Sequence, residues 1–333
     1  MTDIPTCIPG IGKLGRTSGF IPLPRCSDGI FEAGRDGVLS ITGTGDGKVE
    51  FIAFARHTIA FVTSSLGYPA YYPVHPVELR RPVRAVLMDL DGTTVRSESF
   101  WMHIIEKATA SLLGDPRFRL EECDLPYVSG HSVSEHLLYC IAKYCPSASV
   151  EDARALYFEH TRTEMDEIMK GGGKEHAFSP SPGVGEFLLE LKSMGVKLGL
   201  VTSGLYGKAY PEIVSAFRSL GMGDPREFYD CIITAGFPLR SGEVGTLGEL
   251  SPKPHPWLYA EAGRVGLGIG FAERNHTVCI EDSGAGVCSI RLAGYAAIGI
   301  AGGNIIESGT QELCSYFCRD FDEVLDVIKE RQT

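Results

Sequence analysis

The stretch VLMDLDGTTV, residues 86–95, decides the fold that this chain predicts. Its first half is short and apolar, which is typical of a strand buried on both faces of a parallel sheet. Asp89 ends this apolar run, and Asp91 stands just beyond it, before a glycine and two threonines. Ligands of parallel α/β sheets bind beyond the carboxyl ends of the strands. The stretch therefore predicts a buried strand that delivers two carboxylates to a binding site.

From Val83 onward, the chain alternates strand signals with helix signals. Amphipathic segments separate the apolar runs, and one of them begins directly after Pro182 and Gly183 with apolar residues at helical spacing. This alternation predicts an α/β fold with a doubly wound parallel sheet and helices on both of its faces. The expected strands are Val83–Met88, Val196–Thr202, Tyr229–Thr234, Thr277–Glu281 and Ala296–Ile300.

Residues 97–179 interrupt the alternation with segments that show only helical patterns. Because this insertion begins soon after the two aspartates, we expect it to form a helical cap over the mouth of the site. The predicted division of the chain has three parts. They are a β-rich N-terminal extension at 1–80, a catalytic core at 81–96 and 180–333, and a helical cap at 97–179.

The N-terminal residues 1–80 are rich in glycine and proline and read as short strands. A cluster of glycine and aspartate at 43–47 supplies the turn of a hairpin. A segment of this length and glycine content is not expected to have a strong core of its own, so its apolar residues must be buried against another part. The expected strands are Val38–Thr42, Val49–Ala55 and Thr58–Thr63, followed by a proline-rich link at 68–82.

The composition excludes several classes of protein. The 333 residues carry a formal net charge of −11 and no block of Lys and Arg, so nucleic acid is not an expected partner. No apolar run has the length of a membrane span, and the first ten residues lack the pattern of a secretory signal. The ten cysteines are scattered without zinc spacing, which favours reduced thiols in a cytoplasmic protein. The sequence indicates no oligomeric state.

Other polar residues also stand at the ends of predicted strands. The tripeptide TSG at 202–204 follows one strand, and Glu281 and Asp282 end another. Between these two strands, the segment SPKPHP holds Lys253 between prolines. Since the carboxyl ends of parallel strands meet at one edge of the sheet, these groups are expected to lie near Asp89 and Asp91.

These four motifs resemble those of the haloacid dehalogenase superfamily. D-x-D-G-T at 89–93, a strand-end threonine, a lysine before proline and E-D-S-x-x-G at 281–286 occur in the order of that superfamily. The segment IEDSGAGVCSIRLAG is close to the usual wording of its helical-cap phosphatase and β-phosphoglucomutase-like branch. The resemblance covers the chain from residue 83 to near its C-terminus and implies a Rossmann-like core with an inserted cap. It does not cover residues 1–80.

The resemblance implies a catalytic role for each of four residues. Asp89 is the expected nucleophile that becomes an aspartyl phosphate. Asp91 is expected to protonate the leaving oxygen and later to accept a proton from water. Lys253 is expected to neutralise negative charge, and Thr202 to hold phosphoryl oxygens, because phosphoryl transfer depends mainly on positioning and electrostatics.

The resemblance also implies a Mg²⁺ ion and a set of phosphate contacts. Carboxylate oxygens suit Mg²⁺, and a cation between Asp89 and a phosphate dianion relieves their repulsion. Glu281 is open to either a ligand role or a purely structural one. The expected metal ligands are Asp89, Asp282, Glu281 and the backbone carbonyl of Asp91. The expected phosphate contacts are Gly92, Thr93, Ser203 and Gly204.

Two further residues are candidates for contact with the rest of the substrate. Arg96 stands where many relatives carry an acidic residue, and it either meets an anionic part of the substrate or pairs with Glu98. His131, in the segment YVSGHSVSEH, either reaches the leaving group or is an ordinary residue at the start of a helix.

The sequence therefore predicts a Mg²⁺-dependent phosphatase that acts on a small phosphorylated metabolite, such as a sugar phosphate. A sugar phosphomutase of the same superfamily is the first alternative. That reaction requires a second phosphate site in the cap, usually built on an arginine, and Val133 stands near the place where the arginine is expected. The second alternative is a non-catalytic binding or scaffold protein, which residues 1–80 suggest and the intact motifs disfavour.

Overall fold

The computed structural model describes residues 7–15, 18–63, 68–127, 133–174, 176–236 and 251–332, with the backbone alone at 125–127 and 133–135. By contacts, the chain forms two compact units. The first comprises Met1–Thr94, Ser181–Ala209 and Asp224–Thr333, and the second comprises Val95–Pro180 and Tyr210–Gly223. The predicted three-part division of the chain stays a prediction.

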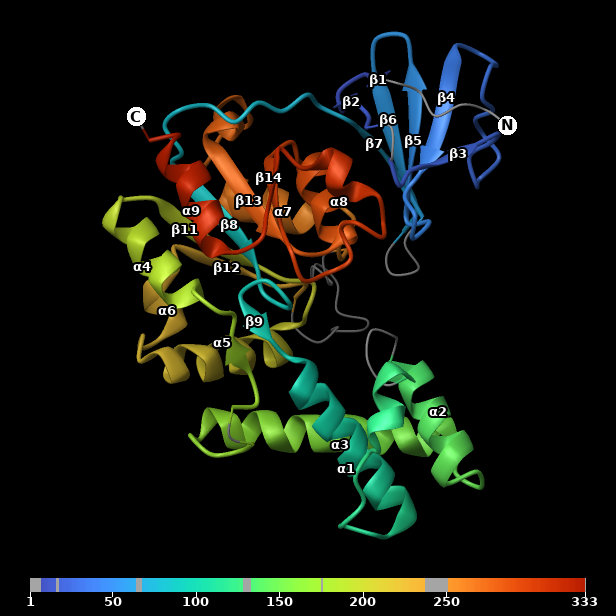
Figure 1. The fold of residues 1–333 in the computed structure, drawn as a ribbon, viewed down its shortest axis with the longest axis vertical. Helices are drawn as coiled ribbons and strands as arrows, with labels where there is room; N and C mark the ends of the chain where they lie inside the picture. The colour runs from blue at the N-terminus through green and yellow to red at the C-terminus, as the bar shows by residue number, and fades with distance from the viewer. Residues whose placement is uncertain are drawn as a thin grey trace, which may run out of the picture. The chain divides into compact units, whose positions relative to one another are not determined.

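The first unit contains a six-stranded sheet in which every neighbouring pair of strands is parallel (Figure 1). This sheet confirms the predicted α/β fold and its five expected strands. The last strand was not predicted, because its three residues YFC are too few to show a pattern. In spatial order the strands are β12 (Cys231–Ile233), β11 (Lys197–Val201), β8 (Ala85–Asp89), β13 (Thr277–Glu281), β14 (Ala296–Ile300) and β15 (Tyr316–Cys318).

Helices cover both faces of this sheet. In Figure 1, α4 (Val184–Ser193) and α9 (Phe321–Lys329) lie on one side of it, and α7 (Trp257–Glu261) and α8 (Gly284–Ala293) lie on the other. The strands β8, β13 and β14 are buried along their whole lengths. Apart from polar residues at the ends of β8 and β13, their sequences are therefore apolar rather than alternating. The remaining helices of the unit are α5 (Tyr206–Leu220, which continues into the second unit), α6 (Pro225–Phe228), η2 (Ala262–Gly266), η3 (Phe271–His276) and η4 (Thr310–Leu313).

The strand order places β8 at the centre of the sheet, with β11 on one side and β13 on the other. The chain therefore leaves β8 toward one edge and later returns to build the other edge, which makes β8 the switch point where such sheets bind ligands. In register, Asp89 pairs with Val201 and Met88 pairs with Ile280. Glu281 therefore ends its strand beside Asp89.

A second sheet in the first unit has five antiparallel strands. It contains the three strands predicted in residues 1–80. The prediction of a link at 68–82 was wrong in its first part, because residues 70–73 pair with the preceding strand as an edge strand. The proline that suggested a link ends this strand, a position that edge strands tolerate. The strands are β3 (Ile21–Leu23), β4 (Val38–Gly43), β5 (Val49–Phe54), β6 (Thr58–Val62) and β7 (Ala70–Pro73), and a separate pair is β1 (Cys7–Ile8) with β2 (Gly12–Lys13).

The two faces of this N-terminal sheet are buried in different clusters. Side chains alternate between the faces of a strand, so Phe51 and Val62 point to one cluster while Ile52 and Phe61 point to another. The first of these clusters also contains Leu258 and Tyr259 of α7, Val287 of α8 and residues of the parallel sheet. One face of the N-terminal sheet is therefore part of the same apolar core as the parallel sheet.

This shared core predicts that the N-terminal sheet stabilises the rest of the first unit. A variant that begins at Pro82 uncovers the apolar surface around Leu258 and is expected to lose solubility or thermal stability. In the full-length chain, Phe51→Ala is expected to lower the free energy of unfolding by about 3–5 kcal/mol, because Phe51 is only 1% exposed and the change leaves a cavity. Thermal and urea denaturation measure both effects.

The matched control for this prediction is Leu39→Ala, since Leu39 lies in β4 of the same sheet and is 65% exposed. Its free energy of unfolding is expected to change by less than about 0.5 kcal/mol. A truncated protein as stable and active as the full chain would contradict the prediction.

The second unit is mainly helical. Its helices confirm the helical pattern predicted for 97–179, and aromatic rings of Phe100, Trp101 and Phe178 pack together in its core. Its role as a cap stays a prediction. The elements are β9 (Val95–Arg96), α1 (Glu98–Leu113), η1 (Glu122–Tyr127), α2 (Val133–Tyr144), α3 (Val150–Met169) and β10 (Ser179–Pro180), with β9 and β10 paired.

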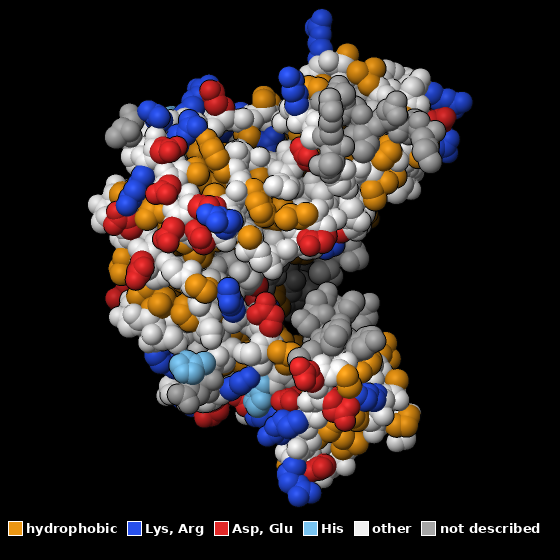
Figure 2. Space-filling model, viewed as in Figure 1, with side chains coloured by type: hydrophobic (Ala, Val, Ile, Leu, Met, Phe, Trp, Pro, Cys, Tyr) orange, Lys and Arg blue, Asp and Glu red, His pale blue; other side chains and the backbone are white. Residues whose placement is uncertain are grey.

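The surface carries no strong bias of charge on the face drawn in Figure 2, where Lys and Arg side chains are interspersed with Asp and Glu side chains.

Among the described helices, none combines the length and the apolar character that crossing a bilayer requires.

Candidate active site

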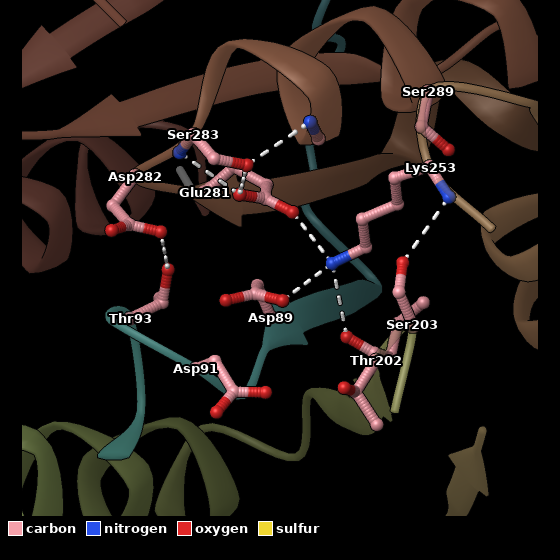
Figure 3. A network of polar contacts seen from close by, with 12 residues as sticks. Asp89, Asp91, Thr93, Thr202, Ser203, Lys253, Glu281, Asp282, Ser283 and Ser289 are labelled. Atoms are coloured by element: carbon pink, nitrogen blue, oxygen red, sulfur yellow. Dashed lines mark hydrogen bonds and ion pairs between the residues drawn. The ribbon is translucent and has the colours of Figure 1, made fainter. Parts of the chain in front are cut away.

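Lys253 connects the ends of the two central strands (Figure 3). Its ammonium group donates hydrogen bonds to Asp89 Oδ1, to Glu281 Oε1 at 2.6 Å and to the carbonyl of Val201 at 3.3 Å. The side chains of Lys253, Asp89 and Glu281 are only 7%, 8% and 0% exposed. The structure thus brings the lysine from the SPKPHP segment to the carboxylates of β8 and β13, as the sequence motifs predict.

Burial controls the protonation of this cluster. Burial, followed by repulsion from Glu281, raises the pKa of Asp89 well above its ordinary value, although Lys253 opposes the rise. Burial alone lowers the pKa of Lys253, but attraction to Asp89 and Glu281 outweighs it, so the pKa lies above its ordinary value. Lys253 therefore stays charged. The ionised form of Asp89 would be favoured by a further cation nearby.

Glu281 is held by hydrogen bonds at both of its oxygens. Oε1 accepts from Tyr259 Oη at 3.0 Å as well as from Lys253, and Oε2 accepts from the amide and the hydroxyl of Ser283 at 3.1 and 3.0 Å. A Cβ atom on Gly286 would lie 1.8 Å from Oε1, so the carboxylate fits only against a glycine in the first turn of α8. Glu281 is therefore a fixed anchor for the lysine.

Asp282 lies next to the turn that follows β8. Thr93 Oγ1 donates to Asp282 Oδ1 at 3.2 Å. Gly92 has φ +87°, and a Cβ atom there would lie 2.2 Å from Asp282 Oδ2, so both backbone conformation and space require glycine. Burial, together with repulsion from Glu281, raises the pKa of Asp282 to about 7. The turn thus closes tightly over a carboxylate that is costly to ionise without a cation.

The arrangement fits a divalent cation. Oxygens of Asp89, Glu281 and Asp282 lie within 4.8 Å of one another, and Asp89 Oδ2 is buried without a hydrogen-bond partner among the described residues. In Figure 3 this oxygen points away from Lys253, toward the side on which Asp282 lies. The three carboxylates, when ionised, exceed the charge of Lys253 by two, which is the charge of one Mg²⁺ ion. Oxygen ligands of this kind suit Mg²⁺.

Another ligand-type cluster, in the second unit, has a different balance of charge. Oxygens of Glu121 and Asp124 and the sulfur of Cys123 lie close together. Lys143 Nζ already donates to Glu121 at 2.8 Å and to Asp124 at 2.6 Å. A protein cation therefore occupies the centre of this cluster, so it carries no comparable case for a metal.

Asp91 is more exposed than Asp89. Its side chain is 35% exposed, and Lys208 Nζ at the start of α5 lies 3.7 Å from Asp91 Oδ1. Thr94 fixes the turn between the aspartates and β9. Its amide donates to the backbone carbonyl of Leu90 at 2.9 Å, and its hydroxyl donates to the backbone carbonyl of Asp89 at 2.5 Å. Asp91 is therefore open to solvent while the turn that carries it is held in place.

The residues after β11 form a small hydrogen-bonded turn. Thr202 is 1% exposed, and its hydroxyl accepts from the amide of Gly204 at 3.0 Å. The hydroxyl of Ser203 accepts from the amide of Lys253 at 3.1 Å. The turn therefore supports the lysine segment and lies at the same edge of the sheet as Asp89.

Two predicted contacts lie outside the described residues of the first unit. Arg96 is exposed in β9, which belongs to the second unit, and His131 lies outside the described residues. Their roles stay predictions. The predicted site residues that the structure brings together are Asp89, Asp91, Gly92, Thr93, Thr202, Ser203, Gly204, Lys253, Glu281 and Asp282.

Sequence reasoning missed the residues that hold the cluster from outside the motifs. Tyr259 anchors Glu281, and Lys208 faces Asp91. Tyr259 stands in an ordinary helical segment, so no local pattern marks it. Ser283, by contrast, lies within the E-D-S-x-x-G motif. A serine before a run of small residues is a typical helix N-cap, and the hydroxyl of Ser283 accepts from the amide of Gly286 at 3.1 Å.

Most of the chain beyond the N-terminal sheet is similar to known proteins. A family model described as haloacid dehalogenase-like hydrolase matches residues 83–294. The β-phosphoglucomutase of Bacillus subtilis (strain 168) is 25% identical over 233 residues, which cover 66% of this chain and 84% of that protein. The matched family region begins after the N-terminal sheet.

Solved structures show the same fold at lower identity. A predicted phosphoglycolate phosphatase of Haemophilus somnus 129PT is 18% identical, with a TM-score of 0.53 over 74% of this chain and 98% of its own. A haloacid dehalogenase superfamily hydrolase of subfamily IA from Geobacter sulfurreducens PCA is 19% identical, with a TM-score of 0.50 over 76% of this chain and 100% of its own.

Proposed function

We propose, since the chain belongs to the haloacid dehalogenase-like hydrolase family, that it is a Mg²⁺-dependent phosphatase of a small phosphorylated metabolite. One observation carries the proposal. Asp89 is buried with one oxygen bound by Lys253, while its other oxygen has no hydrogen-bond partner in the described part of the chain. That second oxygen is available to attack phosphorus or to bind a cation.

In the first step, a carboxylate oxygen of Asp89 forms a bond to phosphorus. The bond between phosphorus and the leaving oxygen breaks, and Asp91 donates a proton to that oxygen. The products of this step are the dephosphorylated metabolite and an aspartyl phosphate on Asp89. The partial exposure of Asp91 suits a group that must give a proton and regain one.

In the second step, a water molecule attacks the phosphorus of the aspartyl phosphate. Asp91, now ionised, accepts a proton from this water, and the bond between phosphorus and the Asp89 oxygen breaks. Inorganic phosphate leaves and Asp89 is restored as a carboxylate. Asp91 therefore serves as the acid in one step and as the base in the next, so the two steps require no other proton donor or acceptor.

The charges around Asp89 oppose the approach of a phosphate dianion unless cations offset them. Lys253 supplies one fixed cation. A bound Mg²⁺ would be held by Asp89, Asp282 and the backbone carbonyl of Asp91, and it would neutralise phosphoryl oxygens. Glu281 also lies in the cluster, but both of its oxygens already accept hydrogen bonds. We assign it to the positioning of Lys253.

The turns after β8 and β11 are the proposed cradle of the phosphoryl group. The turn at Gly92 and Thr93 offers backbone amides next to Asp89. In the turn after β11, Thr202 and Ser203 offer their hydroxyls, and the amide of Gly204 holds the Thr202 hydroxyl in place. Donors fixed in advance stabilise the spread of charge in phosphoryl transfer. Arg96, His131 and the helical cap are proposed to contact the remainder of the substrate.

A sugar phosphomutase is the second candidate, which the 25% identical β-phosphoglucomutase of B. subtilis favours. A mutase returns the phosphoryl group from Asp89 to a second hydroxyl of the sugar rather than to water. The products separate the two candidates, because only hydrolysis releases stoichiometric inorganic phosphate.

The test is a panel of phosphorylated metabolites incubated with the purified protein and Mg²⁺. We expect stoichiometric release of inorganic phosphate from at least one small phosphate monoester, measured by a phosphate assay, with the dephosphorylated product identified by mass spectrometry. Isomerised sugar phosphate without phosphate release would favour the mutase. No turnover of any monoester, with saturable binding of one of them, would favour a binding protein.

A further inference from the structure

We propose that Tyr72, in the edge strand β7 of the N-terminal sheet, is a positioning residue for Lys253. It acts through a hydrogen bond to His255, two residues after the lysine. The inference deepens the proposed function, since it assigns part of the geometry of the catalytic lysine to a sheet that lies outside the matched family region.

The segment that carries Lys253 is held at only a few described points. The amide of Lys253 donates to Ser203 Oγ at 3.1 Å, and the amide of His255 donates to the carbonyl of Pro252 at 3.0 Å. The carbonyl of His255 accepts from Ser289 Oγ of α8 at 2.6 Å. With prolines at 252, 254 and 256, this segment is short and stiff, so a shift of His255 is transmitted to Lys253.

The His255 side chain provides the connection to the N-terminal sheet. His255 is 1% exposed, and its Nδ1 lies 2.8 Å from Tyr72 Oη. Its Nε2 has no hydrogen-bond partner among the residues that the structure describes. Burial lowers the pKa of His255, which favours the neutral ring. Tyr72 is thus the described side chain that satisfies a polar atom of this buried ring, and an unsatisfied buried group is costly.

Tyr72 is itself well placed to hold the histidine. It pairs in register with Ala60 of β6, and its ring packs edge to face against those of His255 and Trp257, at centroid distances of 5.8 and 5.9 Å. The N-terminal sheet is also joined to the core elsewhere, because the amide of Gly45 donates to the carbonyl of Ser308 at 2.8 Å. The tyrosine hydroxyl therefore extends from a strand that is fixed independently of the lysine segment.

The test compares Tyr72→Phe with Tyr71→Phe. Both changes remove one hydroxyl from β7, but Tyr71 faces the opposite cluster and hydrogen-bonds Asp28. We expect Tyr72→Phe to lower kcat about 3- to 10-fold, which corresponds to the loss of one ordinary hydrogen bond, with KM changed less than about twofold. Tyr71→Phe is expected to leave kcat unchanged, since its hydroxyl does not contact the lysine segment.

A double-mutant cycle tests whether the hydroxyl acts through the histidine. If Tyr72 acts only through the ring of His255, then Tyr72→Phe has no further effect on kcat in a His255→Ala background. Additive effects of the two changes would overturn this route, as would a wild-type kcat in Tyr72→Phe or an equal loss in Tyr71→Phe.

Hydrogen exchange gives a readout that does not depend on turnover. The amides of Lys253 and His255 are expected to exchange faster in Tyr72→Phe than in the wild type or in Tyr71→Phe, as followed by mass spectrometry of the peptide at 251–258. Unchanged exchange would overturn the inference even if the protein is a phosphatase. Faster exchange in a protein that hydrolyses no phosphate monoester would instead reject the proposed function and leave the positioning contact in place.

Discussion

Asp89→Asn is expected to reduce kcat for the best phosphate monoester by on the order of 10⁴-fold or more, the scale of losing a catalytic nucleophile. The amide that replaces the carboxylate cannot form the aspartyl phosphate. Its size is nearly the same, so the buried position between Lys253 and the end of β11 remains filled. Steady-state kinetics measure the loss, and mass spectrometry of the trapped enzyme measures the absence of a phosphoryl adduct.

Asp91→Asn is the matched control for this experiment, because it makes the same chemical change two residues away. It removes proton transfer but leaves the nucleophile, so the expected loss in kcat is roughly 10²- to 10⁴-fold. Phosphoryl adduct formation on Asp89 is expected to remain detectable in Asp91→Asn with an activated ester whose leaving group needs no proton. Substantial phosphatase activity in Asp89→Asn, in a protein with an unchanged melting temperature, would remove Asp89 from its proposed role.

Most groups of the cluster around Asp89 could be predicted from the sequence because the carboxylates and Thr202 stand at the ends of apolar strands, whereas Lys253 stands in a proline-rich segment between strands. Parallel strands end at one edge of the sheet, so Thr202 and Asp282 come near Asp89 without any knowledge of side-chain packing. The register between β8 and its neighbours then places Glu281 beside the nucleophile. Here local pattern and topology together determine the geometry.

The contacts that hold the cluster could not be predicted in this way. Tyr259 and Tyr72 meet Glu281 and His255 across 22 and 183 residues of sequence, and nothing local marks either tyrosine. The prolines around Tyr72 also gave its edge strand the sequence pattern of a link between domains. Such contacts depend on how sheets and helices pack, and a single sequence carries no direct signal for that packing.

Removal of divalent metal is expected to abolish turnover, and added Mg²⁺ is expected to restore it. Asp89, Glu281 and Asp282 are buried close together with a single compensating lysine. Without a divalent cation, burial keeps the pKa of Asp89 and Asp282 high, and any ionised carboxylate repels the phosphate dianion. Kinetics after treatment with EDTA, followed by titration with Mg²⁺, measure both parts of this expectation.

Asp282→Asn separates a role in metal binding from a general effect of charge. The change keeps an oxygen for Thr93 and leaves the size of the side chain almost the same, but it removes a hard anionic ligand. The Mg²⁺ concentration for half-maximal activity is expected to rise at least about tenfold, and calorimetric titration is expected to show weaker Mg²⁺ binding by a similar factor. Glu121→Gln is the matched control, since its cluster already contains Lys143, and it is expected to change neither value. Full activity in excess chelator would remove the metal from the mechanism. Loss of activation by Mg²⁺ in Glu121→Gln would instead indicate that the metal binds in the second unit.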